Sequence, residues 1–417
     1  MRDTDKISFD KILICLYSAL ICIGYFSIYS SSFSGTETKI LSLSSTSGKQ
    51  LIFIIISYFT GLIILLTDVK FIIRSSYLLY ILSLISLILV LIFGKEVGGA
   101  KAWFSLGGFG FQPSEFVKLT TILTISKYIH DNEIYLNTIN NIIKISLFIA
   151  IPAFLILLQP DAGSTLVFFG LTIMLFREGF HNRYVFSIII TCLFSFLTIL
   201  IGVSQTVIFL IFCTVVFFIF LKKYRKRLML SFIFFITCSI IISGTNFSYE
   251  NILQSHQKER IDIIIGKEKN KLGSGYNLNQ SLIAIGSGGI LGKGFLKGTQ
   301  NKGNFVPEQN TDFIFCTIGE EFGFIGSLIT LLLFFSFVIR IIYLSEKQYS
   351  RLNRVYGYGL ASIIFTHVFI NVGMTIGLVP VVGIPLPFLS YGGSSMLSFS
   401  LMFFLFLKLN ASKLERF

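Results

Sequence analysis

Long apolar stretches alternate with short polar segments along almost the whole chain. A helix needs about 20 apolar residues to cross a bilayer, and only helices or closed barrels can span hydrocarbon. The stretches lack the residue-by-residue alternation of barrel strands. The pattern therefore predicts an all-α, polytopic transmembrane helical bundle of 10–12 spans, with candidate spans at 12–32, 51–67, 75–94, 115–130, 142–158, 162–177, 184–203, 205–221, 228–244, 312–343, 355–377 and 386–409.

The composition supports a membrane protein and excludes an ordinary soluble one. Of the 417 residues, 53% are hydrophobic and only 13% are charged. Soluble domains carry about a quarter charged residues. The net charge of +13 fits cytoplasmic loops that face anionic lipid, so nucleic acid is not needed to explain it and none is expected as a partner.

Basic residues indicate the orientation of the bundle, because Lys and Arg favour the cytoplasmic side. If the spans alternate, most basic segments gather on one side and both termini are cytoplasmic. The N-terminal residues lead into an uncleaved first helix, since no small-residue cleavage site follows them. The residues that define the cytoplasmic side are Arg2, Lys6, Lys11, Lys70, Arg74, Arg177, Arg183, the basic residues of 222–227, Lys347, Arg351, Arg354, Lys408, Lys413 and Arg416.

The opposite side holds the loops 33–50, 95–114 and 245–311. The last of these has 67 residues, with eight basic residues, five acidic residues and ten glycines. Long loops with a composition of their own are usually functional. Its apolar stretch Leu278–Ile290 predicts a short buried or interfacial helix.

All six cysteines fall within apolar runs, without a CxxC pair or a metal-ligand spacing. Cysteine in such surroundings packs as a small hydrophobic residue. We interpret these residues as small core residues that form neither disulfides nor metal sites. They are Cys15, Cys22, Cys192, Cys213, Cys238 and Cys316.

Three ionisable residues lie in or beside apolar runs, where charges are costly and usually functional. Glu115 and Lys118 are three positions apart and share a helix face. Asp161 follows Gln159 and Pro160, and a proline break between spans suits a polar cavity. Two interpretations stay open: the three charges neutralise one another and hold the bundle together, or they contact a substrate.

Asp312 lies at the boundary between the basic loop and the apolar run 312–343. A carboxylate partly removed from water there is expected to have a raised pKa, nearer the working pH of an enzyme. Alternatively, Thr311 or Asp312 caps the helix that follows. Position alone favours the cap, and the surrounding motif favours a reactive carboxylate.

Other polar residues accompany the late spans. Glu320 and Glu321 lie on opposite sides of one helix, and His367 and Asn371 share a face that is predicted to join helices by hydrogen bonds. The segment 383–395, GIPLPFLSYGGSS, predicts a bent approach to the last span that lines a cavity.

Five motifs, in this order, resemble the SEDS family, the shape, elongation, division and sporulation proteins of the RodA/FtsW type. The resemblance covers nearly the whole chain. The motifs are GAKAWFSLGGFGFQPSEFVKL (99–119), QPDAGS (159–164), GSGYNLNQSLIAIGSGGILGKGFLKGTQ (273–300), FVPEQNTDFIFCTIGEEFGF (305–324) and GIPLPFLSYGGSS (383–395).

The resemblance implies a peptidoglycan glycosyltransferase of the bacterial cytoplasmic membrane. Such an enzyme polymerises lipid II, an undecaprenyl-pyrophosphate-linked disaccharide–pentapeptide, on the outer face by inverting transfer. The GTQ at 298–300 resembles the RodA type more than the FtsW type, which favours cell elongation and rod shape. Asp312 is implied as the catalytic base. Substrate-binding roles are implied for Glu115, Lys118, Asp161, Arg260, Gln300, Glu308 and Thr311.

The resemblance also implies ligands and a partner. The partner is a class B penicillin-binding protein that supplies transpeptidation, and the ligands are lipid II and undecaprenyl pyrophosphate. No cofactor is certain, and a divalent cation on the substrate pyrophosphate stays open because no ligand cluster predicts one. The alternatives are a division-specific FtsW-type paralogue, a flippase for lipid-linked precursors, and a structural scaffold.

Two departures from the family pattern stand out. Asn310 stands where the family commonly has His, so no role for a histidine can be carried over. The family commonly has ten spans, whereas three apolar runs lie within 184–244 where one is usual. We interpret two of these runs as extra spans inside a single integral-membrane domain, 1–417; an even number of added spans keeps the large loop 245–311 outside.

Overall fold

The computed structural model describes residues 9–33, 45–106, 109–136, 138–221, 226–253, 257–259, 261–262, 274–303 and 305–412. Two compact units are distinguished. The first combines Met1–Gly179 with Tyr276–Phe417, and the second is Phe180–Gly275.

Within the described residues, twelve long helices occupy the twelve predicted spans, which confirms the all-α polytopic fold. Ten of them are long and apolar enough to cross a membrane. The other two are α7, which is short, and α5, which buries many polar side chains. The long helices of the first unit are α1 (Lys11–Ser32), α2 (Thr46–Leu66), α4 (Ser76–Phe93), α5 (Pro113–Asp131), α6 (Ile139–Leu157), α7 (Ala162–Arg177), α14 (Ile314–Glu346), α15 (Arg351–Thr375) and α16 (Gly393–Ala411).

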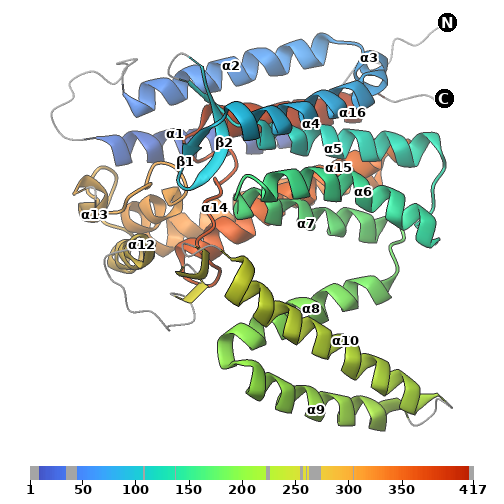
Figure 1. Ribbon diagram of the computed structural model, residues 1–417. Coiled ribbons are helices and arrows are strands. Elements are labelled where there is room, and N and C mark those ends of the chain that lie inside the picture. Colours follow the sequence, from blue (N-terminus) through green and yellow to red (C-terminus); the bar gives the residue numbers. More distant parts are fainter. Residues whose placement is uncertain are drawn as a thin grey trace, which may run out of the picture. The chain divides into compact units, whose positions relative to one another are not determined.

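The core of the first unit lies around α15 and α16. Over the most apolar 18 residues of each helix, 78% of the residues are buried in α15 and 72% in α16, but only 17% in α2. Helix α2 therefore presents most of its surface to lipid. Helix α15 packs on α14, α7 and α5, and α16 packs on α2 (Figure 1). The two most buried spans therefore form the centre on which the outer helices are arranged.

Ion pairs join helix ends at the predicted cytoplasmic side. Asp10, which caps α1, accepts a 2.6 Å hydrogen bond from Arg340 near the end of α14. Glu178, after α7, pairs with Arg351 and Arg354 at the start of α15. Two of the basic residues that are predicted to face the cytoplasm, Arg351 and Arg354, are thus held at the start of α15 by one buried glutamate.

The opposite end carries structure that the sequence did not reveal. Residues predicted as the loop 95–114 form an antiparallel sheet of three strands, β1 (Lys95–Val97), β2 (Ala100–Leu106) and β3 (Phe109–Phe111). The short helices of this end are α12 (Ser274–Gly288) and α13 (Thr299–Lys302), whereas the short helix α3 (Val69–Arg74) joins α2 to α4 at the other end (Figure 1). Helix α12 confirms the short helix predicted at Leu278–Ile290.

The second unit contains the three helices expected within 184–244. They are α8 (Asn182–Ile201), α9 (Val203–Phe220) and α10 (Arg227–Phe247), followed by the π-helical turn η2 (Ser248–Ile252). They pack through a small cluster of buried side chains: Phe194, Leu210, Cys238 and Ile242.

Helix α14 is not one continuous span. It breaks at Gly323, whose φ of 65° and ψ of −158° are not helical. In an unbroken helix the N–H groups of residues 324 and 325 would donate to the carbonyls of residues 320 and 321. Instead, the segment 289–294 is inserted at the break. Phe324 and Ile325 donate to the carbonyls of Gly289 and Ile290, at 2.9 and 3.2 Å.

The inserted segment also satisfies the two freed carbonyls. Lys293 N–H donates to Glu320 O at 3.0 Å, and Gly294 N–H donates to Glu321 O at 2.9 Å. A side chain cannot fit at Gly292, because a Cβ there would lie 2.1 Å from Glu321 O and its φ is +79°. The glycine-rich run of the large loop is therefore a structural insert in α14.

The interpretation of all six cysteines as core residues is wrong for half of them. Cys238 and Cys316 are buried and Cys213 is half-buried. Cys15, Cys22 and Cys192 are exposed on the surfaces of membrane-spanning helices. An apolar run identifies a residue that tolerates lipid, but it does not distinguish the lipid-facing side from the core side.

Substituting Gly292 with Ala should destabilise the first unit. The positive φ alone costs a non-glycine residue about 1–3 kcal/mol, and the contact with Glu321 O adds to that. Thermal unfolding in detergent, followed by circular dichroism, measures the effect. The matched control is Gly286→Ala, at an exposed position of α12 where an added Cβ meets open space. It should melt no lower than the wild type, because alanine is favoured over glycine in a helix. Equal melting of both variants would contradict the insertion.

Candidate functional site

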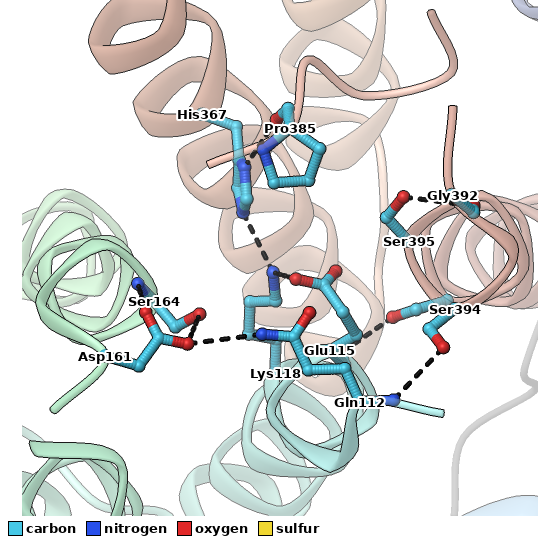
Figure 2. A network of polar contacts seen from close by, with 11 residues as sticks. Gln112, Glu115, Lys118, Asp161, Ser164, His367, Pro385, Gly392, Ser394 and Ser395 are labelled. Carbon is cyan, nitrogen blue, oxygen red and sulfur yellow. Dashed lines mark hydrogen bonds and ion pairs between the residues drawn. The ribbon is translucent and has the colours of Figure 1, made fainter. Parts of the chain in front are cut away.

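A buried ionic network lies between α5 and α15. Lys118 Nζ is 2.7 Å from Glu115 Oε1 and 2.9 Å from His367 Nε2, and all three residues are at most 1% exposed (Figure 2). The Lys118 ammonium also lies 5.1 Å from the centre of the Phe399 ring. The pairing of Glu115 with Lys118 confirms that they share a helix face. Of the three charges predicted to neutralise one another, only these two do so.

The hydrogen bonds of His367 define its tautomer. Its Nδ1 lies 3.1 Å from the Pro385 carbonyl, which can only accept, so Nδ1 carries the proton. Its Nε2 faces the Lys118 ammonium, which can only donate, so Nε2 is the acceptor. A neutral His367 therefore links the ion pair to the bent segment before α16.

Asp161 is absent from this ion pair and lies at the start of α7. Its Oδ1 accepts a 2.9 Å hydrogen bond from Ser164 N–H, which makes it the N-cap residue. Its Oδ2 accepts from Ser164 Oγ at 2.7 Å and from Gln112 Nε2 at 3.2 Å (Figure 2). Asp161 thus joins α7 to the start of α5, and it is half-buried.

The segment 376–392 is non-helical, which confirms the bend that the motif at 383–395 predicts. Helix α16 begins at Gly393, seven residues later than the predicted start of the last span at 386. This segment holds two of the three successive carbonyls of the 310–312 turn. Tyr391 N–H donates to Asn310 O at 2.8 Å, and Ser390 Oγ donates to Thr311 O at 2.6 Å.

The third carbonyl is held from α15. Asn371 is fully buried, and its Nδ2 donates to Asp312 O at 2.8 Å and to Ile384 O at 2.7 Å. One residue therefore ties the Asp312 backbone to the bent segment. His367, one turn earlier on α15, ties the same segment through Pro385. The predicted joining role of the His–Asn pair is confirmed, with backbone carbonyls as the acceptors.

The Asp312 side chain is half-buried and lies beside Gly383. A Cβ added to Gly383 would lie 3.3 Å from Asp312 Oδ2. The N-cap position of α14 falls on Phe313, so the prediction that Thr311 or Asp312 occupies the cap position is wrong. Gly383 is exposed, so the carboxylate lies next to an open stretch of backbone.

Thr311 and Glu308 form a local turn. Thr311 Oγ1 donates to Glu308 Oε2 at 2.7 Å, and Phe313 N–H donates to Glu308 O at 3.2 Å. Glu308 is exposed and has a φ of 59°, which marks a tight turn. These two predicted binding residues therefore lie within one turn of Asp312, at the surface.

Glu320 fixes the GTQ segment. Its Oε1 accepts from Lys293 Nζ, Thr299 N–H and Gln300 N–H, at 2.8, 2.7 and 2.9 Å. Its Oε2 accepts from Asn301 N–H at 3.2 Å. Glu320 is fully buried, and Gln300 itself is half-buried. Glu321 points elsewhere and accepts from Ser30 of α1, so the two glutamates occupy opposite sides as predicted.

Five of the eight predicted site residues thus form two groups, whereas Asp161 and Gln300 lie apart from both, Asp161 bonded to Gln112 and Ser164 and Gln300 bonded to Glu320. Asp312, Thr311 and Glu308 lie together at the surface, while Glu115 and Lys118 are buried beneath the bent segment, and Arg260 lies outside the described residues. Sequence reasoning missed the roles of Ser390, Tyr391 and Lys293. The serine and the tyrosine are in the GIPLPFLSYGG motif, and the lysine is in the glycine-rich run, but nothing in either pattern names their partners.

A metal site receives no support from the side chains that are described. No three His, Cys, Asp or Glu residues among them come together closely enough to hold an ion. A divalent cation on a substrate pyrophosphate therefore stays a prediction, and no step below depends on one.

The fold and site define a multi-pass membrane protein with a positioned carboxylate at one face. The chain belongs to the FtsW/RodA/SpoVE family of cell cycle proteins, whose profile matches residues 10–205 and 202–415. The similar proteins include the peptidoglycan glycosyltransferase RodA of Treponema pallidum (strain Nichols), 30% identical over 99% of this chain and 100% of the relative. Another is the peptidoglycan glycosyltransferase MrdB of Escherichia coli (strain K12), 34% identical over 76% of this chain and 73% of the relative.

Solved structures share the fold. One is a chain of a peptidoglycan synthase complex that coordinates polymerization and crosslinking, with a TM-score of 0.70 and 25% identity over 98% of this chain and 99% of that chain. Another is the rod shape determining protein RodA of Thermus thermophilus, with a TM-score of 0.63 and 22% identity over 99% of both chains. The described residues contain ten helices that are long and apolar enough to cross a membrane. Together with the family, they make the chain a multi-pass protein of the bacterial cytoplasmic membrane.

Replacing Lys118 with Met should destabilise the fold by about 3–5 kcal/mol, because it leaves the Glu115 carboxylate buried without its cation. The double variant Glu115→Gln, Lys118→Met should recover much of that loss, since no charge then remains buried. Thermal unfolding of the four proteins in detergent forms the cycle. A double variant less stable than Lys118→Met alone would argue against the pair.

Proposed function

We propose that this chain polymerises lipid II into glycan strands on the outer face of the cytoplasmic membrane, with Asp312 as the base. It is a peptidoglycan glycosyltransferase by its family and its relatives. The observation that carries the assignment of Asp312 is its position. It is half-buried, its carbonyl and the two before it are each hydrogen-bonded to the bundle, and its carboxylate lies beside an exposed glycine.

The chemistry requires one displacement. The acceptor sugar hydroxyl loses its proton to the Asp312 carboxylate as its oxygen forms a bond to the donor's anomeric carbon. The bond from that carbon to the lipid diphosphate breaks, and the diphosphate takes the electron pair. A single displacement inverts the anomeric centre. A base in fixed geometry and cations near the departing diphosphate are the two protein contributions that lower this barrier.

The cations that can meet the diphosphate are the exposed ones. Lys297 and Lys302 are exposed beside the GTQ segment, and Lys293 is 25% exposed. Lys118 is fully buried and salt-bridged to Glu115, so its support for the proposed reaction is indirect, through His367 and the bent segment. A direct clamp by Lys118 would need the ion pair to open.

A role in elongation rests on the relatives named RodA and MrdB. A protein named FtsW from Wigglesworthia glossinidia is 30% identical over 94% of this chain, so a division role is the alternative. The GTQ segment, held by Glu320, supports the RodA type. The partner that fits is a class B penicillin-binding protein, because a similar structure comes from a complex for polymerization and crosslinking.

Asp312→Asn should lower lipid II polymerisation by about 10²–10⁴-fold, because the amide cannot accept the hydroxyl proton. Glycan product formed by the purified chain with its partner transpeptidase is the readout. Glu96→Gln, an exposed carboxylate on β1, is the control and should polymerise normally. Full activity in Asp312→Asn would remove Asp312 as the base. Lipid II translocation in vesicles without polymerisation by the wild type would instead indicate a flippase.

Ser390→Ala should lower kcat by about tenfold while the KM for lipid II changes little, because Thr311 O loses its donor and the turn that holds Asp312 loosens. Ser395→Ala removes a nearby hydroxyl that bonds only within its own turn, to Gly392 O, and should leave both constants unchanged. Steady-state polymerisation rates separate the two constants. A rise in KM alone in Ser390→Ala would point to substrate binding instead of positioning.

A further inference from the structure

The last turn of α1 is bonded to the two residues that lead into Thr311 and Asp312. Carbonyls in the last turn of a helix have no partner within that helix. The carbonyl of Ser31 is one of them, and Gln309 Nε2 donates to it at 3.0 Å. The Ser31 hydroxyl donates to Asn310 Oδ1. Ser31 therefore holds the turn that carries Asp312 at two successive residues.

Gln309 joins the same turn to a second element, α13. It is 4% exposed, and its Nε2 also donates to Asn301 O at 3.0 Å. Asn301 is 1% exposed, and its N–H donates to Glu320 Oε2 at 3.2 Å. The amide of Gln309 thus bridges the end of α1 and a helix that buried Glu320 already holds.

The end of α1 is itself attached to the bundle. Ser30 Oγ donates to Glu321 Oε1 of α14, and Ser30 and Ser31 are only 1% and 5% exposed. The bent segment and Asn371 of α15 hold the carbonyls of 310–312. Contacts from α1 therefore add a further fixed support, on a separate helix, to the turn that carries the proposed base.

The contact with α1 also gives a role to the residue that departs from the family pattern. Asn310 stands where the family commonly has His. An imidazole can exchange a proton near neutral pH, whereas a side-chain amide only donates and accepts hydrogen bonds. Here the amide oxygen accepts from Ser31, and the backbone oxygen accepts from Tyr391 N–H at 2.8 Å. Residue 310 is thus an attachment point through both its side chain and its backbone.

We propose that Ser31 is a positioning residue for the reaction, acting through Asn310 and Gln309 on the turn that carries Asp312. This inference rests on the proposed function and deepens it by adding α1 to the elements that fix the base. A base must lie within about 2.6–3.2 Å of the hydroxyl whose proton it takes, and a misplacement of about 1 Å can cost 10²-fold in rate. A turn released from α1 would keep its carboxylate but place it less often at that distance.

The first test is steady-state polymerisation of lipid II by the full-length chain with its partner transpeptidase. Ser31→Ala should lower kcat about tenfold and leave the KM for lipid II within about twofold, because the base is displaced and the substrate contacts remain. Gln309→Met, of similar length but without a donor, should lower kcat in the same way.

Ser32→Ala is the matched control for Ser31→Ala. The Ser32 hydroxyl bonds within its own helix, to Ile28 O at 2.8 Å and to Tyr29 O at 3.2 Å. Ser31 Oγ also lies 3.1 Å from Ile28 O, so the two serines share this helical contact and differ in the bond to Asn310. The control should keep both kcat and KM.

A double-variant cycle tests whether Ser31 acts through Asn310. Asn310→Ala should lower kcat about tenfold, and adding Ser31→Ala should lower it little further, because the bond is already lost. Independent effects would instead multiply to a loss of about a hundredfold. Thermal unfolding in detergent shows that each variant is folded.

Hydrogen exchange provides a readout that does not depend on catalysis. The N–H groups of Thr311 and Phe313 bond to Glu308 O within the turn, at 3.1 and 3.2 Å. In Ser31→Ala the peptide 308–316 should exchange about fivefold faster than in the wild type, since a loosened turn opens more often. Ser32→Ala should exchange like the wild type.

Three results would overturn the proposal: wild-type kcat in Ser31→Ala, a higher KM with unchanged kcat, or a hundredfold loss in the double variant. Unchanged exchange in Ser31→Ala would also contradict it. A wild type that polymerises lipid II beside a fully active Ser31→Ala keeps the proposed function and loses this inference. A wild type that does not polymerise contradicts the proposed function, and the exchange rates still decide whether α1 holds the turn.

Discussion

Pairing of freed backbone groups is the constraint on which the outer half of this protein depends. A break in a helix inside a membrane bundle exposes N–H and C=O groups that cost several kcal/mol each if they stay unpaired. At Gly323 the insert 289–294 satisfies two donors and two acceptors of α14. At 310–312 the bent segment and Asn371 satisfy three carbonyls in a row. Both irregular segments are therefore fixed as firmly as the helices.

The buried ion pair extends the same constraint into the core. A buried pair contributes little net stability, because desolvation of both ions offsets their attraction. Its effect here is geometric. Lys118 is shared by Glu115 and His367, and His367 can satisfy it only as the tautomer that also bonds Pro385 O. The position of α5 relative to α15, and of α15 relative to the bent segment, is thus set by one cation.

The sequence predicts this architecture well where hydrophobic length is the signal. Twelve apolar runs gave twelve helices among the described residues, and the orientation inferred from the basic residues stays a prediction. The sequence also located Asp312 and the bend at 383–395, but not the contact between them, because hydrogen bonds to backbone carbonyls leave no side-chain pattern. The break at Gly323 was hidden for the same reason: its partners lie some 30 residues earlier, in a run that reads as a flexible glycine loop.

Buried and exposed lysines have different roles in this protein: the buried one stabilises the structure, and the exposed ones can bind an anionic substrate group. Lys118 is fully buried, and its ammonium is bonded to Glu115 and His367, so its role is to hold the helices in place. Lys297 and Lys302 are exposed on the rigid frame that α14 shares with the GTQ segment, so their charges are open to an anion. A diphosphate held by such cations must leave as the glycosidic bond forms, and weak, exposed contacts permit that departure. A tightly buried cation would bind the diphosphate product as strongly as the transition state, and the added binding would not accelerate the reaction.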